Sequence, residues 1–204
     1  MGRKEQAAET EVALKEAAKR LFAERGYLNT KITDITTSAG RAAGSFYNHF
    51  AGKEELLEAL LADLSAAADE TVSATDTEHN PDFTDPAAVR WHIRGYWLFY
   101  RENAAVMLAL RQAAMVNEEF GRKLVRFGAT EQADVAGHLD YISRAGLRLP
   151  GEPGAALTMM YGVVEQFMQQ RMLGGNPALT ELSDEAAIET LTRFVYRGLT
   201  GRDY

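Results

Sequence analysis

Apolar residues recur at intervals of three and four along nearly the whole chain, and this periodicity is the feature that most limits its fold. The clearest stripe joins Leu14, Ala17, Ala18, Leu21 and Phe22, which is the spacing of one helix face. No segment alternates apolar and polar residues convincingly over the length of a strand, and no internal repeat is present. The sequence therefore predicts an all-α protein of about nine helices.

The polar segment 73–83 is the best boundary in the chain, because it interrupts the helical pattern with Ser, Thr, Asp, Asn and Pro. Asp85-Pro86 then restarts a helix, with Asp as the N-cap and Pro at the first helical position. A later helix is expected to run unbroken from 117 to about 146. We expect two parts, residues 1–70 and residues 71–204.

Composition excludes several classes of protein. The 204 residues contain no Cys, which rules out disulfides, Cys-ligated zinc and thiol catalysis. No apolar run approaches the roughly 18 residues of a membrane span, and the charged start carries no secretory signal. We expect a soluble, cytoplasmic protein that does not bind membranes.

The distribution of charge matters more than its sum. The net charge is −7, yet residues 25–53 carry four basic residues against the single acid Asp34. The same stretch predicts a short helix at 32–39, a Gly-containing turn and a second short helix at 43–50. This is the plan of a helix-turn-helix, whose second helix enters the major groove of DNA.

The first part of the chain resembles the N-terminal domain of the TetR/AcrR family of repressors. The resemblance covers about residues 10 to 62 and is carried by many spaced positions at once. They are Ala17 to Tyr27, Thr30, Ile32, Asp34-Ile35, Ala39-Gly40, Gly44 to Phe50 and Lys53 to Leu57. Beyond residue 70 the chain matches the family only in length and helical pattern.

The resemblance implies a sequence-specific regulator of transcription, a repressor that a small apolar or aromatic ligand releases from palindromic operator DNA. Its candidate DNA contacts fall into three groups. Contacts near base edges are expected from Thr33, Arg41 and Ser45. Contacts mainly with phosphates are expected from Lys31, Tyr47, His49 and Lys53. At Gly44 the backbone is expected to lie close to the DNA. The alternative is a ligand-binding or protein-interaction module of the same fold without specific DNA binding. Single residues also have simpler explanations than DNA contact. Tyr47 would then pack on the first helix, and His49 and Lys53 would be solvated surface residues.

Two positions depart from the family pattern. Lys31 replaces a Thr that would cap the second helix together with Asp34, and Ala42 replaces a small hydroxyl residue before the third helix. The lost hydroxyl removes a cap worth roughly 1 kcal/mol. We expect phosphate contacts to be redistributed toward Lys31 and Arg41 rather than lost.

Nothing in the sequence indicates an enzyme, a cofactor or a metal site. The four histidines, His49, His79, His92 and His138, lie far apart and lack the H-E-x-x-H spacing or any other ligand cluster. Neither a G-x-S-x-G elbow, a Walker loop nor a G-x-G-x-x-G motif occurs. An active site built from scattered residues is the remaining alternative.

The second part of the chain is rich in aromatic and Met side chains. Most such residues are plain core, but the resemblance implies a ligand pocket here, and Met suits deformable pocket walls. The candidate lining residues are Tyr96, Trp97, Tyr100, Met107, Met115, Phe120, Phe127, Met160 and Phe167.

The helices expected at 155–173 and 184–199 carry apolar residues on more than one face. A single helix-turn-helix buries too little surface for a specific site, so we expect a homodimer formed through these two helices. The alternative is that both helices only close a monomeric core.

Overall fold

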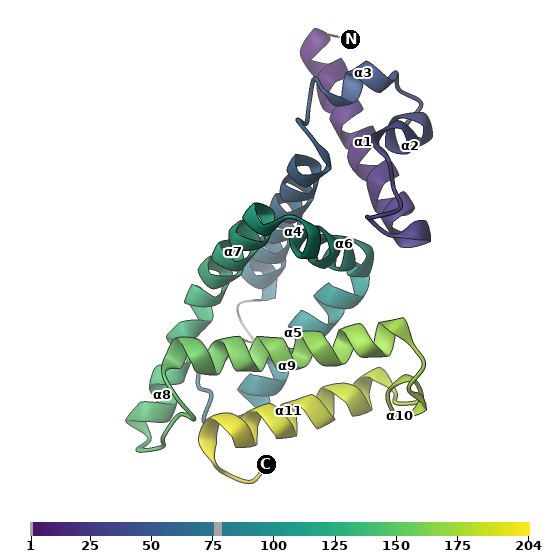
Figure 1. Ribbon diagram of the computed structural model, residues 1–204. Helices are drawn as coiled ribbons and strands as arrows, with labels where there is room; N and C mark the ends of the chain where they lie inside the picture. Colours follow the sequence, from purple (N-terminus) through teal and green to yellow (C-terminus); the bar gives the residue numbers. More distant parts are fainter. Residues whose placement is uncertain (1, 76–78) are drawn as a thin grey trace. The chain divides into compact units, whose positions relative to one another are not determined.

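The computed structural model describes residues 2–75 and 79–204, and the described part is built of eleven helices (Figure 1). The first six are α1 (Arg3–Arg25), α2 (Ile32–Ser38), α3 (Ala43–Phe46), α4 (Lys53–Thr75), α5 (Pro86–Glu102) and α6 (Ala104–Val116). The others are α7 (Glu118–Ala136), α8 (Leu139–Arg144), α9 (Pro153–Leu173), α10 (Pro177–Thr180) and α11 (Asp184–Thr200). The all-α prediction is confirmed. Part of the predicted boundary 73–83, residues 76–78, lies outside the described residues.

The count of about nine helices is too low for two local reasons. The helix expected from 117 to about 146 is broken after Ala136 into α7 and α8, at Gly137, a residue that costs a helix interior about 1 kcal/mol relative to Ala. The additional α10 has four residues, which is too short for a periodic pattern to reveal.

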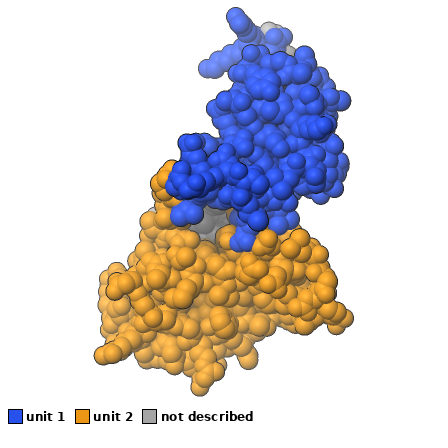
Figure 2. Space-filling view, in the orientation of Figure 1, with its two compact units in different colours: residues 1–73, 103–125 blue, residues 74–102, 126–204 orange. Residues whose placement is uncertain are grey.

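The chain forms two compact units (Figure 2). Unit 1 comprises residues 1–73 and 103–125, and unit 2 comprises residues 74–102 and 126–204. The segment 103–125 therefore packs with the N-terminal helices, whereas the sequence analysis assigned it to the second part.

Unit 1 is organised around α1. Helix α2 packs on α1 and α3, and α6 packs on α1. The buried side chains include Leu14, Leu21 and Phe22 of α1, Ile35 of α2, Phe46 of α3 and Leu56, Leu57 and Leu60 of α4. Helix α1 ends at Gly26, which has a φ of 79° and is favoured there because it lacks a side chain.

Two polar contacts join the segment 103–125 to the rest of unit 1. The backbone N–H of Tyr27 donates to Oε1 of Gln112 at 2.9 Å. Lys123 forms an ion pair with Glu58 of α4 at 2.8 Å. The first contact satisfies a backbone donor just beyond the end of α1, so α6 helps to hold the turn that leads into α2.

Unit 2 is a packed group of helices in which α11 lies against α5 and α9, and α5 lies against α9. Its largest fully buried side chains include Phe83, Trp97, Tyr100, Leu139 and Ile142. The predicted helix start at Asp85 is confirmed, because its Oδ1 accepts the N–H of Ala87. Helix α11 begins in a similar way, with Oγ of Ser183 accepting the N–H of Ala186. None of the described helices combines the length and the apolar character needed to cross a bilayer.

The Gln112 contact gives a first testable prediction. Replacing Gln112 with Ala leaves the partly buried N–H of Tyr27 without its acceptor and should lower the free energy of unfolding by about 1–3 kcal/mol. Gln112→Glu keeps an acceptor oxygen and should lose less. Urea denaturation measures the difference. The control is Gln6→Ala, at an exposed position of α1, which should stay within about 0.5 kcal/mol of the parent; an equal loss in Gln6→Ala would contradict the assigned role.

Candidate nucleic-acid interface

Helices α2 and α3 have one buried and one exposed face. Ile35 and Phe46 are fully buried, whereas Thr33 and Gly44 are exposed. Tyr47 directly follows α3, and its residue is 63% exposed although its ring has an edge contact with Phe46. Tyr47 therefore does not pack into the core on α1, which was the plainer reading of this residue.

The start of α2 retains half of the family's capping arrangement. The carboxylate of Asp34 accepts the backbone N–H of Lys31 at 2.9 Å and lies 3.4 Å from the guanidinium of Arg25. Asp34 thus satisfies one backbone donor at the helix start without the hydroxyl that Lys31 replaces. The Lys31 residue itself is exposed.

At the start of α3 no side chain caps the helix at Ala42, and the Ser45 hydroxyl makes a different contact. Oγ of Ser45 donates to the carbonyl of Ala42 at 2.7 Å and so ties down the first turn. Gly44, next to it, is exposed, and a Cβ added there would meet nothing within 4 Å. A large partner therefore has room to approach the backbone closely at Gly44.

Arg41 and His49 are less accessible than the sequence analysis expected. The Nη2 atom of Arg41 lies 4.0 Å from Glu9, and its buried Nε has no hydrogen-bond partner among the described residues. The side chain of His49 is 13% exposed, and its Nδ1 lies 3.9 Å from Glu11. Both side chains therefore lie against α1 at one end of the candidate surface.

Lys53 has a role that the sequence analysis did not consider. Its ammonium donates to the carbonyls of Tyr27 at 2.9 Å and Thr30 at 2.7 Å, and lies 4.1 Å from the centre of the Tyr27 ring. Burial lowers the pKa of Lys53, and the Tyr27 hydroxyl donates to Glu54 at 2.9 Å. Two of the three donors of the ammonium are thus engaged within the protein. The sequence carries no local signal of this contact, because Lys53 and Tyr27 are far apart along the chain.

The nine candidate ligand-binding residues are divided between the two units. Met107, Met115 and Phe120 belong to unit 1, and the other six belong to unit 2. Met115 is 86% exposed and Phe120 is buried. A cavity of about 10 Å³ in unit 2 includes two of the nine and offers room for about one water molecule. Its lining residues are His92, Ile93, Tyr96, Met160, Tyr161 and Val164.

Polar groups lie at the wall of this cavity. The Tyr96 hydroxyl donates to Oε1 of Glu165 at 2.9 Å. Burial and the Glu165 carboxylate raise the pKa of Tyr96, and burial raises the pKa of Tyr161 to about 12. Both phenols therefore stay protonated and can act as hydrogen-bond donors at neutral pH.

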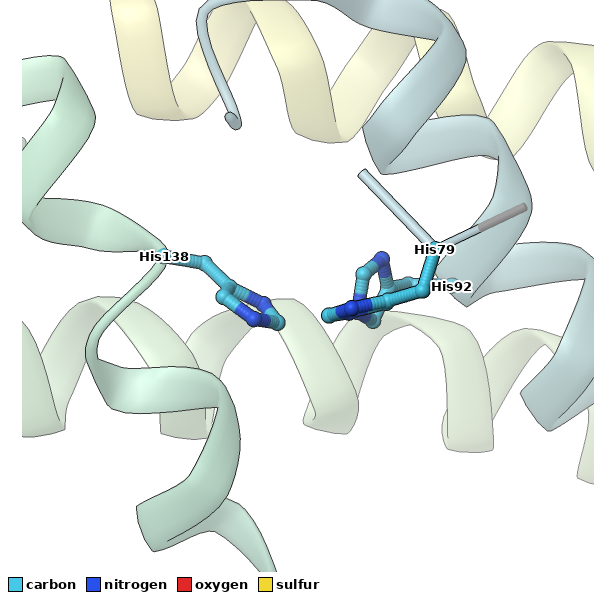
Figure 3. A group of neighbouring side chains, drawn as sticks. All are labelled: His79, His92 and His138. Atoms are coloured by element: carbon cyan, nitrogen blue, oxygen red, sulfur yellow. The ribbon is translucent and has the colours of Figure 1, made fainter. Parts of the chain in front are cut away.

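Three of the four histidines, expected from the sequence to lie far apart, lie together in the folded unit. His79, from the segment before α5, His92 of α5 and His138, at the junction of α7 and α8, point toward one another in unit 2 (Figure 3). One ring nitrogen of each lies within 4.8 Å of the others. His79 and His92 are 13 residues apart along the chain, and His92 and His138 are 46 residues apart. Such spacings give no signal in the sequence that the three rings lie together.

Comparison with known proteins agrees with the geometry of α1 to α4. Residues 14–60 match the model of "Bacterial regulatory proteins, tetR family". "HTH-type transcriptional regulator TtgR" of Pseudomonas putida is 40% identical over 79 residues, 39% of this chain and 38% of that one. "HTH-type transcriptional repressor KstR2" of Mycobacterium tuberculosis is 50% identical over 48 residues, 24% of each chain. The chain thus spans about two fifths or less of the length of these curated relatives.

The fold of the whole chain is also similar to that of solved regulators. The transcriptional regulator FadR from Bacillus subtilis, solved in complex with stearoyl-CoA, superposes with a TM-score of 0.72 at 18% identity. The match covers 92% of this chain and 98% of FadR, which shows a shared fold. All three proteins are described as regulators, consistent with the expectation that the chain is not an enzyme. The chain is thus similar to the tetR family of bacterial regulatory proteins over residues 14–60, and its fold as a whole is shared with solved regulators.

Proposed function

We propose that the protein is a DNA-binding transcriptional repressor that acts on bacterial operator DNA in the cytoplasm. The observation that carries this proposal is the exposed face of α2 and α3, which lies within the matched residues 14–60. Thr33, Gly44 and Tyr47 are exposed there, above a buried face formed by Ile35 and Phe46. This is the arrangement that lets a short helix enter the major groove while its other face holds the fold together.

The proposed contacts divide by chemistry. Lys31 and Tyr47 are assigned to phosphates, because both are exposed and reach beyond the helix surface. Thr33 and Ser45 are assigned to base edges, with Arg41 beside them. The phosphate contact of Lys53 is assigned to its backbone N–H at the start of α4, because its ammonium already donates to two carbonyls. The rival function is a module of the same fold that binds a ligand or a protein but no specific DNA.

The phosphate assignments can be tested by substitution. Tyr47→Ala should weaken binding about tenfold, the loss expected for about one charge-assisted hydrogen bond, while leaving the thermal midpoint unchanged because the side chain is exposed. Lys31→Ala should lower the slope of log affinity against log salt by about 1. Fluorescence anisotropy with a duplex selected from a randomised library measures both.

The matched control is Lys19→Ala. It removes the same charge from unit 1 at a position on α1 that is paired with Glu16 at 2.9 Å, and it should keep the parental salt slope. If selection yields no duplex that is preferred over random competitor at low salt, the repressor assignment fails and the rival module remains.

A homodimer is the second part of the proposal. The exposed faces of α9 and α11 combine small and apolar residues: Ala155, Met159, Gly162 and Leu173 on α9, and Phe194 and Gly198 on α11. Phe194 is 64% exposed, an unusual position for a large aromatic side chain unless another surface covers it. Cβ atoms at Gly162 and Gly198 would meet nothing within 4 Å of the chain's own atoms, so helices of a second copy have room to approach closely.

The dimer assignment predicts opposite effects on assembly and on folding. Gly162→Leu improves helix propensity by about 0.5–1 kcal/mol, and its Cβ meets no atom of the described residues within 4 Å, so unfolding at low protein concentration should not become easier. The same change, like Phe194→Arg, should shift the mass in light scattering from twice 22.5 kDa toward 22.5 kDa. Val125→Arg, at an exposed apolar position of unit 1, should remain dimeric. A parental mass of 22.5 kDa at micromolar concentration would contradict the dimer.

The third part of the proposal is release from DNA by a small apolar or aromatic effector that enters unit 2. FadR from Bacillus subtilis, which has the same fold, was solved with stearoyl-CoA, and this supports a ligand site in a protein of this fold. The cavity beside Tyr96 and Met160 is the starting point, although its volume of about 10 Å³ is far below the roughly 300 Å³ of a typical ligand site. Binding therefore requires movement of Met160 and its neighbours, for which a flexible thioether is suited.

A further inference from the structure

The three histidines of unit 2 form a compact cluster in a largely apolar setting. The ring centres of His79, His92 and His138 lie 4.8–5.3 Å apart (Figure 3). Phe83 covers His92 and His138 at 4.9 and 5.2 Å, and Trp91 lies 5.2 Å from His79. Three segments of the chain contribute one ring each, so the cluster exists only in the folded unit.

The tautomer of His92 leaves one nitrogen free for a ligand. Its Nδ1 lies 2.9 Å from the carbonyl oxygen of Ala88, one turn earlier in α5. A carbonyl can only accept, so Nδ1 carries the proton and the lone pair is on Nε2. A second hydrogen bond of this kind is what fixes the orientation of metal-binding histidines in proteins.

His138 provides an independent observation. The residue is 9% exposed, and its buried Nδ1 has no hydrogen-bond partner among the described residues. A buried nitrogen without a hydrogen-bond partner lowers the free energy of unfolding by about 1–3 kcal/mol unless a ligand binds it. The rings of His79 and His92 lie beside His138, with centres 5.0 and 4.8 Å away.

The charge state suits a cation. Burial, with the neighbouring His138 and His79, lowers the pKa of His92 to about 4, and burial with the neighbouring His79 lowers the pKa of His138. Both rings are therefore neutral at pH 7, the form that ligates a metal without first releasing a proton.

From this geometry we propose that His79, His92 and His138 bind a divalent transition-metal ion, Zn²⁺ in the first instance. Three neutral imidazoles without carboxylates favour Zn²⁺ and its neighbours in the first transition series over Mg²⁺ or Ca²⁺, which need oxygen ligands. Three protein ligands leave a fourth tetrahedral position for water or another donor.

The distances are compatible with such a site. Nitrogens bound to tetrahedral zinc at about 2.0–2.1 Å lie about 3.3 Å apart. The three ring nitrogens already lie within 4.8 Å of one another, so each pair has to close by about 1.5 Å at most. The terminal torsion of His has broad wells, so rotation of the His79 and His138 rings supplies this closure while His92 keeps its hydrogen bond to Ala88.

A bound ion would join the segment before α5, α5 itself and the junction of α7 and α8. His92 also lines the cavity assigned to the effector, so the ion would lie at the wall of that cavity. The proposal does not depend on DNA binding, because every ligand lies in unit 2.

The test uses the full-length protein, stripped with a chelator and titrated with Co²⁺ and then Zn²⁺ against a chromophoric competitor. One equivalent of Co²⁺ per chain should produce visible d–d absorption of a four-coordinate nitrogen site, which Zn²⁺ bleaches on displacement. Because the chain has no Cys, thiolates cannot cause this signal. Zn²⁺ should also raise the thermal midpoint in proportion to the logarithm of its concentration, and Mg²⁺ should not.

Two variants and one control identify the ligands. His79→Ala removes the ring on the segment before α5, and His138→Ala removes a buried ring whose Nδ1 has no partner to lose. Each should lower Zn²⁺ affinity at least about 100-fold, since loss of a mere supporting contact already costs 10–100-fold. His49→Ala, the fourth histidine and part of unit 1, should bind like the parent.

The contrary results are equally clear. Undiminished Zn²⁺ affinity in His79→Ala and His138→Ala would assign binding to surface carboxylates and overturn the proposal. So would the lack of any d–d absorption in the parent protein, which would make the cluster a plain aromatic core of neutral histidines.

Discussion

The ammonium of Lys53 is the contact on which the geometry of the candidate DNA surface depends. It binds the carbonyls of Tyr27 and Thr30 at the turn between α1 and α2, and it lies over the Tyr27 ring. Without it, the Thr30 carbonyl would lose this donor, the Tyr27 carbonyl would keep only the N–H of Thr30 at 3.2 Å, and the start of α4 would lose its tie to the turn before α2. The Gln112 amide acts on the same turn from the other side. One short turn thus links α1, α2, α4 and α6, and the exposed face of α2 and α3 is held rigidly because of it.

Much of this could be predicted from the sequence, because helices with buried stripes carry a local signal. The stripe from Leu14 to Phe22, the Gly26 terminus and the caps at Asp85 and Ser183 all depend on residues within one or two turns of each other. The helix-turn-helix was predicted for the same reason. Contacts between distant positions carry no such signal, which explains why Gln112 and Lys53 were missed.

The individual site residues show the same limit. Exposure of Lys31, Thr33, Gly44 and Tyr47 agrees with the pattern, since each lies on the face opposite the apolar stripe. Partial burial of His49 depends on α1, far away in the sequence, and could not be derived from the third helix alone. The ligand-binding candidates were chosen by composition, which does not distinguish buried Phe120 from exposed Met115.

The histidine cluster shows how an apolar core and a polar site can share one place. Packing explains why Phe83, Trp91 and the three rings lie together, because flat rings bury much surface at 4.8–5.3 Å. Packing does not explain why three of the four histidines of the chain converge, nor why Nδ1 of His138 has no hydrogen-bond partner in the described part of the chain. Phe or Leu would fill the same volume without the cost of a buried polar atom. A cation that binds all three rings removes that cost, so the arrangement is better explained as a binding site than as a core.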